Sequence, residues 1–166
     1  MRTLEYHDTT VRVRYAETDQ MGVVYHANYL IWFEVGRVEL MRAMGFEYRT
    51  METEDDCHIV VAEAHCHYEK PARYDQVLRV RTRIAEWRTR IVRFNYEIFR
   101  DGREQVHSQQ FKVESKNGAR SSAVLLATGF TTHVICGSNG RPKALPPKYR
   151  DVLVHLNIPN PDGSEV

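Results

Sequence analysis

A single carboxylate precedes a dense aromatic run in the stretch AETDQMGVVYHANYLIWFE, which extends from Ala16 to Glu34. The carboxylate is Asp19, and His26 follows seven residues later, with Gly22 between them. A carboxylate beside hydrogen-bond donors can attack an acyl carbonyl, or it can activate a water molecule that does so. Because Asp is also common in turns, the same residues fit a simple turn in which His26 is a partly exposed cap.

The donors for such chemistry would come from a helix that we predict to begin near Asn28. Backbone N–H groups around Tyr25 and His26 then lie at or just before its N-terminus, where main-chain donors lack partners and the helix dipole is positive. Such groups suit a developing oxyanion. Gly22 permits the bend that would turn Asp19 toward them.

The predicted helix, residues 29–44, is apolar on nearly every side, which is typical of a buried helix. Gly45 follows it as a natural stop. Two charges, Glu34 and Arg37, lie three residues apart on its inner side, and we expect them to pair with each other. A direct chemical role for Glu34 is the alternative.

Strand patterns surround this helix, at residues 10–15 before it and at 57–71, 77–87, 90–99 and 122–135 after it, with a further possible strand at 105–114. The strict alternation in 77–87 and 90–99 indicates an antiparallel sheet with one face on the core. We therefore expect an α+β fold in which five or six antiparallel strands wrap one long helix, with sheet after the helix, a loop at 136–149 and a frayed tail.

Composition limits the classes of function. The 166 residues fit one domain, 1–166, with a core at about 8–150, and a net charge of +1 gives no general attraction to nucleic acid. No apolar stretch is long enough for a signal peptide or a membrane span. Three cysteines without framework spacing, Cys57, Cys66 and Cys136, suit reduced thiols in a cytoplasmic protein.

Two other clusters suggest binding sites that we do not expect. In HCHYE, His65 and His67 share one face of a strand while Cys66 points to the other, so the three side chains cannot converge on a metal ion. The arginine ladder of the strand at 77–87 could bind nucleic acid, but Glu86, Glu97 and Glu114 are available to neutralise it. We predict neither a metal nor a nucleic-acid partner.

The stretch RVRYAETDQMGVVYHANYLIWFEVGRVELMRAMG resembles the opening motif of hotdog-fold acyl-CoA thioesterases of the 4-hydroxybenzoyl-CoA thioesterase type. The segments YEKPARYDQVLRVRTRI, LLATGFTTHVI and GRPKALP are similar to later parts of the same family, so the resemblance covers most of residues 8–150. One departure is the segment 101–120, which stands where relatives have a short turn. It weakens what the resemblance implies about subunit packing and substrate.

The resemblance implies a hotdog fold, an antiparallel sheet wrapped around one long central helix, that assembles as a homodimer or homotetramer. It implies that Asp19 is the catalytic carboxylate and that the His26 backbone N–H binds the thioester oxygen, with assistance from its imidazole. Tyr25 and Gly22 are then candidate substrate contacts. Two further candidates, Arg88 and Arg90, would meet the phosphates of coenzyme A, although both also suit a solvated hairpin tip.

The predicted reaction is hydrolysis of an acyl-CoA thioester, or of an acyl group on a carrier protein, to a carboxylic acid and a free thiol. Asp19 would act as nucleophile or as general base, and no metal or other cofactor is needed. Two alternatives are a hotdog-fold dehydratase of 3-hydroxyacyl thioesters and a non-catalytic acyl-thioester binding protein. The first motif resembles the hydrolase version rather than the dehydratase, and an intact Asp19 argues against a protein that only binds.

Overall fold

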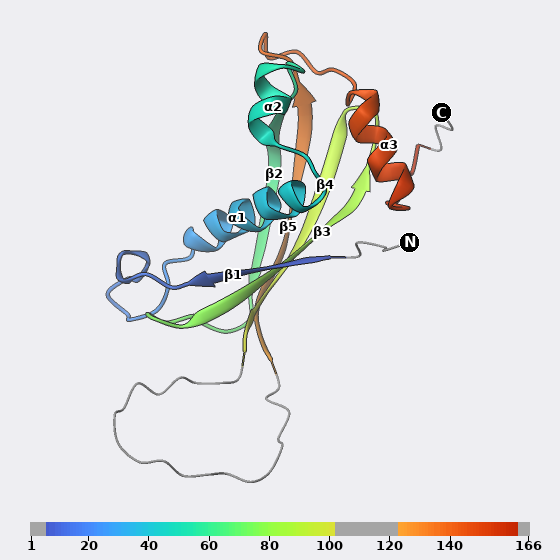
Figure 1. Ribbon diagram of the computed structural model, residues 1–166. Helices are drawn as coiled ribbons and strands as arrows, with labels where there is room; N and C mark the ends of the chain where they lie inside the picture. The colour runs from blue at the N-terminus through green and yellow to red at the C-terminus, as the bar shows by residue number, and fades with distance from the viewer. Residues whose placement is uncertain (1–5, 102–122, 163–166) are drawn as a thin grey trace.

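The computed structural model describes residues 6–101 and 123–162. Within these ranges, five antiparallel strands form one sheet in the order β1-β3-β4-β5-β2, and a long helix lies across one face of it (Figure 1). In chain order the elements are β1 His7–Arg12, the 3₁₀ helix η1 Tyr15–Glu17, α1 Asn28–Ala43, α2 Tyr48–Thr53, β2 His58–Tyr68, β3 Val77–Trp87, β4 Ile91–Arg100, β5 Val124–Cys136 and α3 Pro147–His155.

The alternating patterns predicted the central strands correctly. In β3 and β4, every second side chain is buried beneath α1, while the intervening polar side chains face outward; the buried ones are Leu78, Val80, Thr82, Ile84, Val92, Phe94, Tyr96 and Ile98. The turn between these strands is a tight hairpin in which the Arg88 N–H donates to the Ile91 carbonyl at 2.7 Å. The sheet is therefore the antiparallel sheet expected, with one face on the core.

Helix α1 begins at Asn28 as predicted, and Gly45, with φ at +81°, ends it. It packs closely on β3 because Gly36 faces that strand. A Cβ atom at Gly36 would lie 2.4 Å from Thr82 Oγ1, too close for any other residue. Phe33 stacks on Tyr96 of β4 with ring centroids 4.3 Å apart.

The prediction that α1 is buried on every side is wrong for a single chain. The sheet covers one face only, so Leu30, Ile31 and Val35 remain 39%, 47% and 36% exposed on the other. Strand β2 is exposed as well, because it lies at the edge of the sheet with β5 as its one neighbour. The apolar side of α1 and the β2 edge are thus both uncovered in one protomer.

Three predictions about element boundaries need correction. The first strand ends at Arg12 rather than at residue 15, because the Glu17 carboxylate accepts a hydrogen bond from the Arg14 N–H at 2.7 Å and closes the turn of η1. The chain after α1 is not all sheet, since α2 and α3 are helical. Helix α3 has a recognisable signal in Pro147 at its start, followed by buried Tyr149 and Leu153 at helical spacing.

Packed structure continues past residue 150. Beyond α3, the Pro159 carbonyl accepts a hydrogen bond from the Trp87 N–H at 3.0 Å, and the Ile158 carbonyl accepts one from the Trp87 indole at 3.1 Å. The predicted strand at 105–114 and most of the segment 101–120 lie outside the described residues. Among the described helices, none has both the length and the apolar character needed to cross a membrane.

Candidate active site

The loop between β1 and α1 is built around the buried carboxylate of Glu17. Its oxygens accept hydrogen bonds from the Arg14 guanidinium at 2.9 Å and from the Trp32 indole at 3.3 Å. Burial would raise the pKa of Glu17, but these hydrogen bonds outweigh burial and hold that pKa below its ordinary value. Sequence reasoning missed this residue, although its position three residues after Arg14 is a signal for local pairing.

The backbone of Glu17 also fixes the approach to the helix. Its carbonyl accepts hydrogen bonds from the Tyr25 N–H at 2.9 Å and from the Asn28 side-chain amide at 2.8 Å. The Tyr25 N–H is therefore already used, which corrects the prediction that it belongs with the free donors at the helix start. The Tyr25 side chain is exposed, and its ring lies 4.3 Å from that of His26.

Asp19 lies at the start of a tight turn of the chain. Its N–H donates to the Val23 carbonyl at 2.9 Å, and its carbonyl accepts from the Gly22 N–H at 3.0 Å. Gly22 has φ at +72°, so the prediction that glycine permits this bend is confirmed. One carboxylate oxygen of Asp19 accepts the Met21 N–H at 2.8 Å, and the side chain is half-buried.

The first turn of α1 leaves main-chain donors at the site. Asn28 donates to the Tyr25 carbonyl at 3.0 Å and Tyr29 to the His26 carbonyl at 3.3 Å, so these carbonyls point along the helix. The amides of His26 and Ala27 point the other way, and neither has a hydrogen-bond partner within the described residues. They lie at the positive end of the helix dipole.

Asp19 and His26 line the same pocket, which has a volume of about 350 Å³. The other lining residues come from the same loop, from α1, and from the end of β2 with the chain that follows it: Val23, Val24, Tyr29, Tyr68, Glu69, Lys70 and Pro71. Tyr68 links two of these parts, because its hydroxyl donates to the His26 carbonyl at 3.1 Å. Gly22 and Tyr25 do not line this pocket; Gly22 shapes the loop, and Tyr25 packs beside His26.

Arg88 and Arg90 lie far from this pocket in the same chain. Strand β3 has 11 residues, so its two ends are about 35 Å apart at roughly 3.3 Å per residue. The Asp19 loop lies near the first end, because the Val24 N–H donates to the carbonyl of Ala72, just before β3, at 2.9 Å, and the arginines follow the second end. Arg88 is paired with Asp162 at 3.1 Å. Their assignment to coenzyme A stays a prediction that one protomer does not support.

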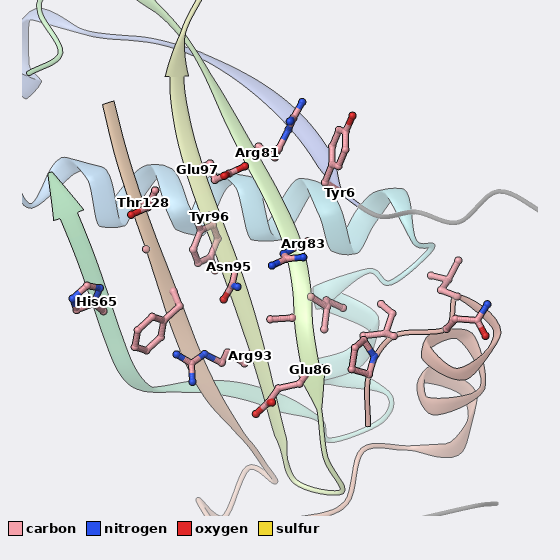
Figure 2. A pocket seen from close by; sticks show the side chains of 18 residues that line it. Tyr6, His65, Arg81, Arg83, Glu86, Arg93, Asn95, Tyr96, Glu97 and Thr128 are labelled. Atoms are coloured by element: carbon pink, nitrogen blue, oxygen red, sulfur yellow. The ribbon is translucent and has the colours of Figure 1, made fainter. Parts of the chain in front are cut away.

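The outer face of the sheet carries the arginine ladder over a groove of about 1120 Å³ (Figure 2). Arg79 and Arg81 both contact Asp8, at 3.1 and 2.9 Å, and Arg79 also contacts Asp101 at 3.0 Å. Near the start of β3, the ladder is thus neutralised by these aspartates rather than by the glutamates that we expected. Glu97 and Glu86 do lie opposite Arg81 and Arg93 in the strand register, and Glu114 is outside the described residues.

The histidine and cysteine cluster on β2 is dispersed. The His65 ring stacks on Phe130 at 5.2 Å, and His67 lies 3.3 Å from Glu69. In the described parts of the chain, no three His, Cys, Asp or Glu side chains are arranged to hold a metal ion. All three cysteines, Cys57, Cys66 and Cys136, are free thiols.

A polar cluster that the sequence did not predict lies between α1 and the sheet. Arg37 is buried, but its partners are the Tyr48 hydroxyl at 3.0 Å and His133 Nε2 at 3.3 Å, while Glu34 is exposed. The predicted pairing of Arg37 with Glu34 is therefore wrong. Thr131 and Tyr96 extend the cluster, through hydrogen bonds of 2.8 Å from Thr131 to His133 and 2.7 Å from Tyr96 to Thr131.

Comparison with known proteins decides the family. A family model described as the thioesterase-like superfamily matches residues 13–153, which is most of the chain. The chain belongs to this superfamily. This membership and the sheet around one long helix confirm the predicted family and hotdog fold.

Several known proteins are similar to this chain. YneP of Bacillus subtilis is 44% identical over 89 residues, 54% of this chain and 64% of YneP. The acyl-CoA thioesterase YbgC of Haemophilus influenzae is 36% identical over 91 residues, 55% of this chain and 67% of YbgC. These alignments span about two thirds of the relatives' own length. The crystal structure of DHNA-CoA thioesterase from Staphylococcus aureus is 27% identical, with a TM-score of 0.76 and 97% of each chain covered.

Proposed function

We propose that this protein hydrolyses acyl-CoA thioesters to a carboxylic acid and free coenzyme A. The observation that carries the proposal is the pocket that Asp19 and His26 line together, since the His26 N–H at the start of α1 has no hydrogen-bond partner among the described residues. Membership of the thioesterase-like superfamily supports it, as do the activities named for YbgC and for the Staphylococcus aureus enzyme. Carrier-protein thioesters present the same reacting group and belong to the same proposal.

The chemistry assigns a role to each part of the pocket. The thioester oxygen accepts a hydrogen bond from the His26 N–H, which polarises the carbonyl carbon and stabilises the tetrahedral oxyanion. An Asp19 oxygen then either attacks that carbon, forming a mixed anhydride that water hydrolyses, or takes a proton from a water molecule that attacks. In both routes the C–S bond breaks and the thiolate of coenzyme A leaves. Because a thiolate is a good leaving group, no strong general acid is required.

A thiol-release assay over a panel of acyl-CoA substrates tests this proposal. The wild-type protein should release thiol from at least one class of acyl group, and Asp19→Asn should lower kcat by at least about a hundredfold, the scale of general acid–base contributions. Circular dichroism should show that the variant keeps its fold. Near-normal turnover by Asp19→Asn would remove Asp19 from the mechanism, and formation of an enoyl product from 3-hydroxyacyl-CoA would indicate a dehydratase instead.

The variant His26→Ala separates the main-chain donor from the imidazole. The substitution keeps the backbone N–H at residue 26, so we expect less than about a tenfold loss in kcat. A loss as large as that of Asp19→Asn would instead assign the imidazole an essential role. Gly22 and Tyr25 act on this site indirectly, through the loop and through packing on His26.

We further propose that the functional protein is a homodimer or a tetramer of two dimers. The support is the pair of uncovered surfaces on one protomer, the edge strand β2 and the apolar residues Leu30, Ile31 and Val35 of α1. An edge strand offers unpaired backbone groups, and exposed apolar side chains favour burial. Together they are typical of a surface that a second copy of the chain covers. The site pocket borders the end of β2, so a partner bound there would enclose the substrate.

We also propose a cytoplasmic location. The free thiols of all three cysteines support it, as does the proposed acyl-CoA substrate.

A further inference from the structure

Tyr68 is the last residue of β2, yet its side chain reaches the start of α1. Its hydroxyl donates a hydrogen bond to the His26 carbonyl at 3.1 Å, between residues 42 positions apart in the chain. Its ring packs edge-on against Tyr29 with centroids 5.1 Å apart, and against His26 at 6.5 Å. These contacts tie the edge strand to the helix terminus that borders the Asp19 pocket.

The hydrogen bond from Tyr68 acts on a peptide group that also carries one of the free donors. The His26 carbonyl and the Ala27 N–H belong to one planar peptide, so fixing the oxygen fixes the direction of the N–H. The same oxygen accepts a second hydrogen bond, from the Tyr29 N–H at 3.3 Å. Neither the Ala27 N–H nor the neighbouring His26 N–H has a hydrogen-bond partner within the described part of the chain.

The Tyr68 hydroxyl is suited to this task over a wide pH range. Burial, together with the nearby Cys66 thiol, raises the pKa of Tyr68 to about 12. The phenol therefore stays protonated and remains a donor at every pH at which the hydrolysis would be measured. Its hydrogen bond to His26 is not lost by titration.

We propose that Tyr68 is a positioning residue, which holds the His26–Ala27 peptide so that the Ala27 N–H stays beside the His26 N–H as a second donor aimed at the thioester oxygen. The proposal rests on the proposed hydrolase function of the same pocket. It assigns to Tyr68 no proton transfer and no bond to the reacting atoms. Its effect should therefore fall on the transition state, where the oxygen carries most charge, rather than on substrate binding.

The test is Tyr68→Phe, which removes the hydroxyl and keeps the ring against Tyr29. We expect kcat to fall by about five- to tenfold, the scale of one net hydrogen bond, while KM changes by less than about twofold. The thermal midpoint should stay close to that of the wild type. The fold-loss in kcat should be the same at every pH from about 6 to 9, because the phenol does not titrate there.

The matched control is Tyr74→Phe. Tyr74 is exposed, its ring contacts Tyr15 at 5.8 Å, and its hydroxyl makes no hydrogen bond within residues 6–101 and 123–162. This variant should match the wild type in kcat and in KM. The same loss in both variants would show a general response to removing a tyrosine hydroxyl and would overturn the proposal.

Other outcomes are equally decisive. A wild-type kcat for Tyr68→Phe, a loss confined to KM, or a loss confined to the alkaline side of the pH profile would overturn the positioning role. Failure of the hydrolase function is a different result, since the wild type would then release no thiol or Asp19→Asn would keep its activity. If Asp19→Asn is inactive and Tyr68→Phe is normal, only the role of Tyr68 is rejected.

Discussion

Two carboxylates two residues apart have different surroundings in this loop. Glu17 is buried, and hydrogen bonds from Arg14 and Trp32 occupy its oxygens. Asp19 is half-buried, and the Met21 N–H is its one hydrogen-bond donor among the described residues. A fully hydrogen-bonded carboxylate is a poor nucleophile and a poor base. Glu17 therefore has a structural role, and Asp19 is the carboxylate available for catalysis.

Gly22 should be required for activity beyond its effect on stability. An Ala at φ of +72° is strained, so Gly22→Ala should lower the free energy of unfolding by about 1–2 kcal/mol and displace the loop that holds Asp19. Urea unfolding and thiol release measure the two effects. We expect kcat to fall severalfold, because small misplacements of a reacting group are costly.

Gly45→Ala is the matched control for Gly22→Ala. Gly45 has φ at +81° and, like Gly22, has room for a Cβ atom, since no other atom would lie within 4 Å of it. It ends α1 on the side away from the pocket, so its substitution should cost similar stability and leave kcat unchanged. Equal activity losses in the two variants would show that strain alone, and not the Asp19 loop, explains the result.

At the scale of elements, the contact between α1 and β5 should make stability depend on pH. His133 of β5 is buried there against Arg37 of α1. Burial of His133, together with the nearby Arg37 guanidinium, lowers its pKa from 6.5 to about 4. His133 is therefore neutral at pH 7, and the single lone pair of its Nε2 atom faces both Arg37 and Thr131. Protonation would place a second positive charge beside Arg37.

The sign of this pH dependence follows from proton binding. Between pH 6.5 and 4 the unfolded chain binds a proton at residue 133 and the folded chain does not, so stability falls as the pH falls through this window. The lost contribution is on the order of 3 kcal/mol. Urea unfolding of the wild type and of His133→Gln at several pH values measures it.

The His133→Gln variant isolates this contribution, because acidic groups lose stability in the same direction in both proteins. The stability difference between wild type and variant should shrink as the pH falls from 6.5 to 4 and stay constant above about pH 7.5. Parallel stability curves across the whole range would show that His133 does not carry the effect.

At the scale of the whole molecule, the sheet order leaves β2 at the edge, beside the uncovered face of α1. If a second copy covers this surface, a charge placed on it should separate the protomers without unfolding them. Ile31 is 47% exposed in one chain, so Ile31→Glu should keep the fold and shift the protein toward monomers in sedimentation velocity.

The control for Ile31→Glu is Val154→Glu, on α3. Val154 is equally exposed but belongs to α3, which lies on the other side of the sheet from the edge strand β2 (Figure 1). This variant should keep the assembly of the wild type. A wild-type protein that sediments as a monomer, or an Ile31→Glu variant that assembles normally, would contradict the proposed interface.

The sequence by itself determined the elements whose signals are local. Period-two alternation specified β3 and β4, because each side chain in a strand faces opposite to the next. The polar loop before an apolar run gave the start of α1 at Asn28, and Gly22 gave the bend beside Asp19. The motif around Asp19 and His26 also led to the correct family.

Only the tertiary structure decided the contacts between distant segments. The partners of Arg37 lie on α2 and β5, so its spacing from Glu34 could not reveal them. The tie from Tyr68 to His26 joins residues 42 positions apart. The exposed side of α1 depends on where the sheet ends. Hydrophobicity shows that a side chain prefers burial, whereas the order of the strands decides which face the chain itself can cover.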